Sequence, residues 1–206
     1  IRQFERGDHG WAERLIGVDA GTGALGFVRG QETPVTDALI PATLRGTAKP
    51  GDIFESCALA IAIADQVARR LNAVGGAALF IDYGHPHSAF GDTLQALKDH
   101  KFHSVLDQPG DADVTAHVDF AAIGRTILEA DGRVGAVLTQ GTFLRMLGIE
   151  QRAELLKETA DAEQAKLIDT ALARLIEADQ MGTLFKVLIG YGRDTAPPPC
   201  VSGAEG

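Results

Sequence analysis

Hydrophobic and polar positions along the chain alternate between helical and extended periodicity. In residues 55–73 apolar side chains recur every four positions with alanines between them, which predicts a helix. The first half of this helix is almost wholly apolar, so we expect it to be buried on most sides. A short continuous apolar run follows at 77–81, which is typical of a central parallel strand covered on both faces.

The remaining pattern predicts further strands and helices in alternation. The other predicted strands are 11–18, 24–28, 133–139 and 184–189, and the other predicted helices are 120–130, 142–147, 151–158 and 161–179. Residues 30–52 carry several prolines and glycines and are predicted to be loop with at most one short strand. This order indicates an α/β fold. Ligands of such sheets bind beyond the carboxyl ends of the strands, which singles out Asp82, Tyr83 and Gly84.

Composition narrows the classes of function. The chain has 206 residues and a net charge of -9, which argues against nucleic-acid binding because phosphate-binding proteins usually present a basic face. No apolar run reaches the ~18 residues needed to cross a bilayer. The cysteines, Cys57 and Cys200, form no metal or redox motif. We therefore expect neither a nucleic-acid partner nor a membrane span.

Residues 21–26 read Gly-Thr-Gly-Ala-Leu-Gly, which has the G-x-G-x-x-G spacing of a nucleotide-binding loop. Such a loop needs a helix that starts at its end, so that the helix N-terminus faces the ligand. The residues that follow, 27–30, are typical of a strand and then a loop. The sequence therefore favours a hairpin turn over a nucleotide loop.

Histidines cluster in the middle of the chain. His85, His87, His100, His103 and His117 fall within 33 residues, and two of the spacings resemble those of metal ligands. No cysteine lies nearby, and a loop can hold solvated histidines at little cost. We favour solvated histidines and expect no metal site.

Residues 113–120, Asp-Val-Thr-Ala-His-Val-Asp-Phe, alternate polar and apolar side chains, which is typical of a half-buried strand. Two interpretations of His117 and Asp119 remain open. In one, Asp119 caps the helix that begins at Phe120 and His117 is a half-buried structural histidine. In the other, this segment and Asp82-Tyr83-Gly84 line one crevice.

Several longer motifs resemble the MidA family of S-adenosylmethionine-dependent protein arginine methyltransferases. The resemblance covers residues 1 to about 190. The matching stretches are Ile1–Phe4, Trp11-x-Glu13-Arg14, Phe80–Gly84, Gly91–Ala96, Pro109–Phe120, Thr139–Ile149 and Met181–Val187.

The resemblance implies the C-terminal part of a class I, Rossmann-like methyltransferase sheet with an inserted hairpin and loops. Residues 1–192 would form this partial domain, and 193–206 would be a disordered tail. The family's cofactor loop would lie upstream of Ile1, so S-adenosylmethionine is expected in the full-length protein and no cofactor-binding residue is assigned. Residues 133–139 and 184–189 should lie on one side of 77–81, with the last strand antiparallel.

The implied activity is methylation of an arginine side chain in a protein, with a core subunit of respiratory complex I as the family's best-known substrate. Asp82 and Asp119 are candidates for orienting the guanidinium, His117 for accepting a proton, and Tyr83 for a cation–π wall. Gly84 and Thr115 complete the expected substrate-binding set. A homodimer is a further expectation, in the bacterial cytoplasm or the mitochondrial matrix. A non-catalytic module that binds a partner protein is the alternative.

Overall fold

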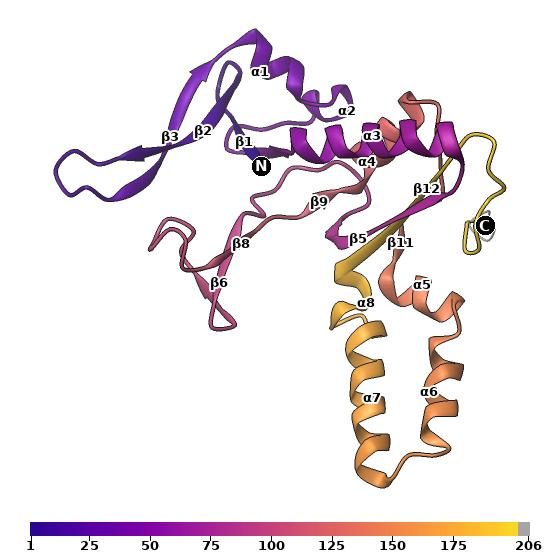
Figure 1. Ribbon diagram of the computed structural model, residues 1–206. Helices are drawn as coiled ribbons and strands as arrows, with labels where there is room; N and C mark the ends of the chain where they lie inside the picture. The colour runs from indigo at the N-terminus through magenta and orange to yellow at the C-terminus, as the bar shows by residue number, and fades with distance from the viewer. Residues whose placement is uncertain (202–206) are drawn as a thin grey trace. The chain divides into compact units, whose positions relative to one another are not determined.

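The computed structural model describes residues 1–201 (Figure 1). The chain divides into two compact units, each built from separate stretches of sequence. The first unit comprises Ile1–Leu59 and Ser88–His117, and the second comprises Ala60–His87 and the chain from Val118 onward. The chain passes from the first unit to the second after Leu59 and again after His117.

The first unit contains a four-stranded antiparallel sheet in the order β3-β2-β1-β4. Its strands are β1 (Arg2–Arg6), β2 (Trp11–Val18), β3 (Leu25–Glu32) and β4 (Ile53–Ser56). The segment predicted to be loop instead forms two short helices, α1 (Pro34–Leu39) and α2 (Ala42–Arg45). Ile40, which follows α1, packs with Phe4, Trp11 and Phe54 in the core of this unit. This burial explains why a proline-rich segment is ordered.

The glycine-rich segment after β2 is a hairpin turn, as predicted. The Asp19 carboxylate accepts hydrogen bonds from the backbone N–H groups of Gly21 and Thr22, and strand pairing resumes at once with Val18 opposite Leu25. No helix follows the glycines, because residues 25–32 form β3. The hairpin extends beyond β1 in Figure 1.

A second, three-stranded sheet in the first unit has the order β7-β6-β8. Its strands are β6 (Gln95–Lys98), β7 (Lys101–His103) and β8 (Asp113–Thr115). Both pairings are antiparallel, and Gln95 lies opposite Thr115. This pairing places the end of β8 next to the segment 91–94.

The second unit is built on a five-stranded mixed sheet in the order β10-β12-β5-β9, with β11 also paired to β12. Its strands are β5 (Ala77–His85), β9 (Val118–Asp119), β10 (Arg133–Val134), β11 (Leu138–Thr139) and β12 (Phe185–Tyr191). β12 is antiparallel to β5 and lies between β5 and β10, which confirms the predicted placement of the last strand. β9 is parallel to β5.

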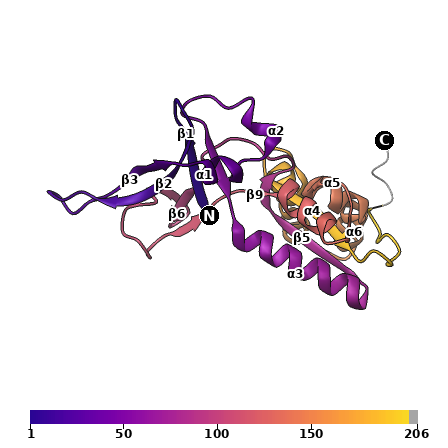
Figure 2. The same cartoon turned by 90° about the horizontal axis from the view of Figure 1, so that it is seen from above.

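Helices pack on both faces of this sheet. On one face, Ala64 and Ala68 of α3 (Ala58–Val74) and Phe120, Ile123 and Ile127 of α4 (Phe120–Glu129) pack around Leu188. Figure 2 shows α3 and α4 alongside β5. On the other face, Phe143 of α5 (Gln140–Met146) packs on Val187 and Ile189.

The predicted burial of 77–81 and of the apolar helix is wrong for several of the larger side chains, although Phe80 packs against the core. Leu79 and Ile81 of β5 are 50% and 47% exposed, and Ile63 of α3 is 48% exposed. Among residues 1–201, strand pairing on the second edge of β5 involves Gly84 and His85 alone, through β9. Small alanines of α3 make the contact with the core, so the larger apolar side chains on its other sides remain accessible to solvent.

An antiparallel pair of helices, α6 (Ile149–Lys157) and α7 (Ala162–Ile176), projects from the second unit (Figure 1). At the end of α7, the backbone carbonyl of Ile176 lies close to Gly141 and Gly182. A Cβ at either glycine would collide with this carbonyl. Gly182 belongs to α8 (Met181–Leu184), which leads into β12. The close backbone approach therefore anchors the helical pair to the sheet.

Residues 193–201 pack onto the rest of the second unit. The Arg193 N–H donates to Asn72 Oδ1 at 3.0 Å, the Gly76 N–H donates to Thr195 Oγ1 at 3.2 Å, and Val201 packs beside the cluster around Phe143. Residues 202–206 of the predicted disordered tail lie outside the described residues. The domain limits of 1–192 and 193–206 stay a prediction.

Candidate active-site segments

The carboxyl end of β5 carries three of the predicted site residues. Asp82 is exposed, and its carboxylate accepts a hydrogen bond of 2.8 Å from the Tyr83 N–H. The ring of Tyr83 meets that of Phe185 edge to face, with centroids 5.4 Å apart. This contact fixes the ring beside the sheet, so Asp82 and Tyr83 occupy defined positions at the strand end.

Gly84 is buried because another backbone passes directly over it. A Cβ at this position would lie 3.0 Å from the carbonyl carbon of Val118 and 3.0 Å from Cε2 of Phe120, with the Val118 oxygen closer still. The parallel pairing of Gly84 with Val118 and of His85 with Asp119 depends on this approach. A packing requirement thus accounts for the glycine.

Asp119 caps helix α4, as one of the two interpretations of the sequence predicted. Its Oδ1 accepts a hydrogen bond of 2.9 Å from the Ala122 N–H. The pairing of β9 with β5 holds Asp119 opposite His85, three residues along β5 from Asp82. Both predicted carboxylates therefore belong to the same end of the same sheet.

Lys186 is a residue of this strand end that sequence reasoning did not single out. It lies directly opposite Asp82 in the β5–β12 pair, and its ammonium donates to the carbonyls of Thr183 and Leu184. Burial lowers the pKa of Lys186 from its ordinary value of 10.5. The sequence signal was available, since Lys186 lies in the family-like stretch Met181–Val187.

The alternating stretch 113–120 does not form one strand. Residues 113–115 are β8 of the first unit and residues 118–119 are β9 of the second, so the chain leaves one sheet and joins another at Ala116 and His117. Val114, which should be buried in a half-buried strand, is 55% exposed. The alternating pattern correctly predicted extended backbone. It could not show that the two ends of this stretch pair with different sheets.

Thr115 and His117 therefore belong to the first unit, whereas Asp82, Tyr83, Gly84 and Asp119 belong to the second. A single cavity shared by Asp82, Tyr83, His117 and Asp119 stays a prediction.

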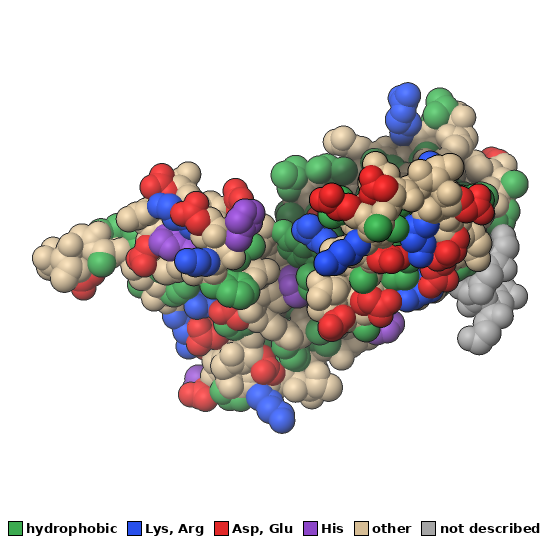
Figure 3. All heavy atoms as spheres, turned by 90° about the horizontal axis from the view of Figure 1, so that it is seen from below, with side chains coloured by type: hydrophobic (Ala, Val, Ile, Leu, Met, Phe, Trp, Pro, Cys, Tyr) green, Lys and Arg blue, Asp and Glu red, His purple; other side chains and the backbone are tan. Residues whose placement is uncertain are grey.

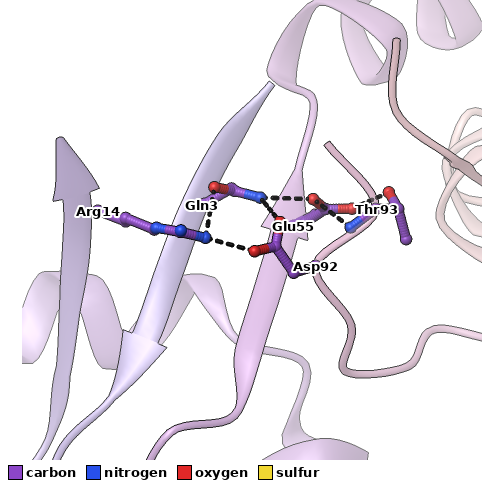
Figure 4. A network of polar contacts seen from close by, with 5 residues as sticks. All are labelled: Gln3, Arg14, Glu55, Asp92 and Thr93. Carbon is purple, nitrogen blue, oxygen red and sulfur yellow. Dashed lines mark hydrogen bonds and ion pairs between the residues drawn. The ribbon is translucent and has the colours of Figure 1, made fainter. Parts of the chain in front are cut away.

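A polar network in the first unit surrounds the Glu55 carboxylate (Figure 4). Its Oε1 accepts hydrogen bonds from Gln3 Nε2 at 2.8 Å and from the Thr93 N–H at 3.1 Å. Its Oε2 accepts a short hydrogen bond from the Thr93 hydroxyl. That hydroxyl in turn accepts the backbone N–H of His117 at 2.9 Å. The network thus reaches a predicted site residue.

Arg14 and Asp92 extend the network along the sheet. Asp92 accepts from Gln3 Nε2 at 2.8 Å and from Arg14 Nη1 at 2.6 Å. The guanidinium of Arg14 lies over the ring of Phe27, 3.6 Å from its centroid. Gln3 is almost fully buried, at 4% exposed, so its amide is held in place by these partners.

Four of these five network residues lie in the stretches that resemble the MidA family. Gln3 is in Ile1–Phe4, Arg14 ends Trp11-x-Glu13-Arg14, and Asp92 and Thr93 are in Gly91–Ala96. Sequence reasoning gave none of them a role, because their contacts join segments that are far apart in the chain. Glu55 was missed because it was assigned to a helix, whereas it lies in β4.

Two of the five clustered histidines have a ring nitrogen within hydrogen-bond distance of a backbone carbonyl. His85 Nδ1 lies 2.8 Å from the His87 carbonyl, and His103 Nε2 lies 3.1 Å from the Asp107 carbonyl. Across residues 1–201, no group of three or more His, Cys, Asp or Glu side chains is arranged to hold a metal ion.

Within the same residues, no helix is both long and apolar enough to span a bilayer. Acidic and basic side chains are interspersed on the face drawn in Figure 3.

The glycine-rich segment 21–26 does not fit a cofactor loop. Its amides are partly taken by the side chain of Asp19, and a strand follows it where a helix N-terminus would have to face the phosphate or adenosyl group. No step of a reaction can therefore be assigned to a cofactor at this turn.

The sheet of the second unit is mixed, and its last strand is antiparallel to β5, as the resemblance to a methyltransferase family implied. A family model described as "Putative S-adenosyl-L-methionine-dependent methyltransferase" matches residues 1–138, and the chain belongs to this family. The match confirms the methyltransferase resemblance seen in the sequence.

Named relatives are arginine methyltransferases. The chain is 38% identical over 188 residues to the mitochondrial protein arginine methyltransferase NDUFAF7 of Xenopus tropicalis, which covers 90% of this chain and 42% of the relative. It is 33% identical over 164 residues to the human protein of the same name, which covers 78% of this chain and 35% of the relative. The chain spans less than half the length of these relatives.

Solved structures confirm the α/β methyltransferase fold. A Burkholderia thailandensis protein is 30% identical with a TM-score of 0.83, and the match covers 99% of this chain and 54% of that one. Another structure from this organism, bound to S-adenosyl-homocysteine, is 28% identical with a TM-score of 0.83, covering 98% of this chain and 52% of that one.

Proposed function

We propose that the protein is an S-adenosylmethionine-dependent protein arginine methyltransferase. The site residues of this chain are assigned to binding of the substrate. The observation that carries the proposal is the 38% identity to the Xenopus tropicalis arginine methyltransferase across 90% of this chain. The two acids at the carboxyl end of the β5 sheet support it.

Arginine methylation needs a guanidinium nitrogen held in line with the methyl group. The guanidinium stays protonated, with a pKa above about 12, and its planar fork pairs best with carboxylates. Asp82 is exposed at the strand end and Asp119 is held at the start of α4, so both can receive N–H donors from a substrate. We assign them the orientation of the substrate arginine.

The other assignments follow the same chemistry. His117 accepts the proton that the substrate nitrogen loses after attack. Tyr83, whose ring is fixed by Phe185, forms a cation–π wall. Gly84 and Thr115 complete the proposed substrate-binding set.

The test of these roles is His117→Ala in the protein at the full length of its relatives, assayed by methyl transfer to a purified core subunit of respiratory complex I. Turnover should fall about 100-fold, as suits the loss of a proton-transfer group. Cofactor affinity, measured by calorimetry, should change little because His117 is assigned to the substrate. Near-normal turnover would remove His117 from the mechanism.

The finer assignments of substrate and location are also proposals. The mitochondrial relatives favour the mitochondrial matrix as the compartment. A core subunit of respiratory complex I, which the resemblance to the MidA family implies, is the proposed substrate. A bacterial cytoplasmic protein with an equivalent substrate is the other option. Mass spectrometry of the arginines in that subunit, with and without the protein, tests the substrate.

Self-association is proposed for the 206-residue chain through the edge of β5. Leu79 and Ile81 are about half exposed there, and an exposed apolar edge strand is a template for pairing. Ile81→Lys should shift sedimentation from dimer to monomer. Wild-type chain that sediments as a monomer at high concentration would exclude the dimer.

A non-catalytic module that binds a partner protein is the second candidate. Absence of methyl transfer by the full-length protein, with retained binding to the complex I subunit, would support this candidate.

A further inference from the structure

We propose that Thr93 is a positioning residue for His117, with Glu55 orienting its hydroxyl group. The proposal rests on the proposed role of His117 in proton transfer. It concerns the first unit alone, to which all three residues belong.

Only one assignment of donors and acceptors fits the hydrogen bonds of the Thr93 hydroxyl. The Glu55 carboxylate can only accept, so the Thr93 hydroxyl donates to its Oε2. The lone pairs of that hydroxyl are then available to the backbone N–H of His117, which donates to it at 2.9 Å. Glu55 is held in turn by Gln3 Nε2 and by the N–H of Thr93 itself.

The hydrogen bond from the His117 N–H to the Thr93 hydroxyl lies where the chain passes from one strand to the next. Ala116 and His117 lie between β8 and β9 and belong to neither strand. The N–H of His117 is therefore not held by a strand ladder, and the Thr93 hydroxyl takes it instead. A hydroxyl fixed by a half-buried carboxylate restricts the main chain at the residue whose side chain must meet the substrate.

Removal of the hydroxyl should loosen His117 without removing its imidazole. Thr93→Val keeps the shape of the side chain but leaves the His117 N–H without its acceptor. Thr93→Ser keeps the hydroxyl. A displacement of about 1 Å at a catalytic group can lower a rate by up to about 100-fold, so the expected loss in Thr93→Val lies between about 10- and 100-fold.

The first measurement is hydrogen exchange of the His117 amide by NMR on the 206-residue chain. The amide should exchange slowly in wild type and in Thr93→Ser, and faster in Thr93→Val. Thr47→Val is the matched control, since the Thr47 hydroxyl is exposed and donates to Leu44 in the same unit. Unchanged His117 exchange in Thr93→Val would overturn the proposal.

The second measurement is turnover of the full-length protein on the complex I subunit. Thr93→Val should lower kcat with little change in KM, and Thr93→Ser should restore kcat. If Thr93→Val fails to fold, Thr93→Ala removes the same hydroxyl with less bulk and serves in its place.

The two failures are distinguishable. If His117→Ala keeps normal turnover, the role of His117 in the proposed function fails, whatever Thr93 does. If His117→Ala is impaired while the hydroxyl-deleted Thr93 variant turns over normally, the positioning role fails and the proposed function stands.

Discussion

Gly84→Ala should destabilise the second unit strongly, and the structure sets the size of the effect. The added methyl group would lie 3.0 Å from the Val118 carbonyl carbon and from Cε2 of Phe120, a ring that is 1% exposed. The Val118 backbone cannot rotate away as a flexible side chain would, because it is paired with β5 at this residue. Overpacking of this kind lowers the free energy of unfolding by about 1–3 kcal/mol. Because the clash is with backbone atoms, we expect a loss of about 3 kcal/mol.

The assay is thermal unfolding followed by far-UV circular dichroism. For a chain of this length each kcal/mol shifts the midpoint by about 2–4 °C, so Gly84→Ala should lower it by roughly 6–12 °C. Trp11 fluorescence is unsuitable, because Trp11 lies in the first unit.

Gly124→Ala is the matched control in the same unit. A Cβ at Gly124 would lie 3.8 Å from Leu188 Cδ2, which is ordinary contact, and the residue is inside α4. Alanine is the better helix former, so this variant should stabilise by about 0.5–1 kcal/mol. A Gly84→Ala midpoint equal to or above that of wild type would refute the close approach of β9 to β5.

Three further predictions concern charge and cofactor. Asp119→Ala should cost about 1 kcal/mol through loss of the α4 cap, whereas Asp119→Asn should keep the cap and stability yet lower methyl transfer, measured side by side. Burial lowers the pKa of Lys186 in the folded protein, so between that pKa and 10.5 the unfolded chain binds more protons than the folded chain. The free energy of unfolding should therefore rise with pH in this range. Lys186→Met should flatten that rise, which denaturant titrations at several pH values would measure. The 206-residue chain should show no appreciable S-adenosylmethionine binding by calorimetry; tight binding would revive residues 21–26 as a cofactor loop.

Local pattern predicted the elements whose character is set within the element itself. The β2–β3 hairpin and the cap at Asp119 follow from turn residues and a capping side chain. The antiparallel placement of the last strand was implied by the family resemblance instead. Periodicity located α3 but placed its start early, because Ile53–Ser56 is recruited by pairing with β1, a contact across some fifty residues that no local pattern reveals.

Burial and the candidate site were harder to predict for the same reason. Apolar spacing shows which residues share a face, but not whether anything covers that face, so Ile63 and Ile81 were expected to be buried and are half exposed. The polar network around Glu55 assembles from four segments of the chain. The resemblance marked three of those segments, and only the fold shows that they meet.

The central claim is that these residues serve transfer of a methyl group to arginine, and one measurement tests it most directly. The full-length protein is incubated with tritium-labelled S-adenosylmethionine and the purified complex I core subunit, and the labelled product is hydrolysed to amino acids. The account predicts that the label elutes as methylarginine and that Asp82→Asn together with Asp119→Asn abolishes it. Label on another amino acid, or undiminished methylarginine in that double variant, would contradict the account.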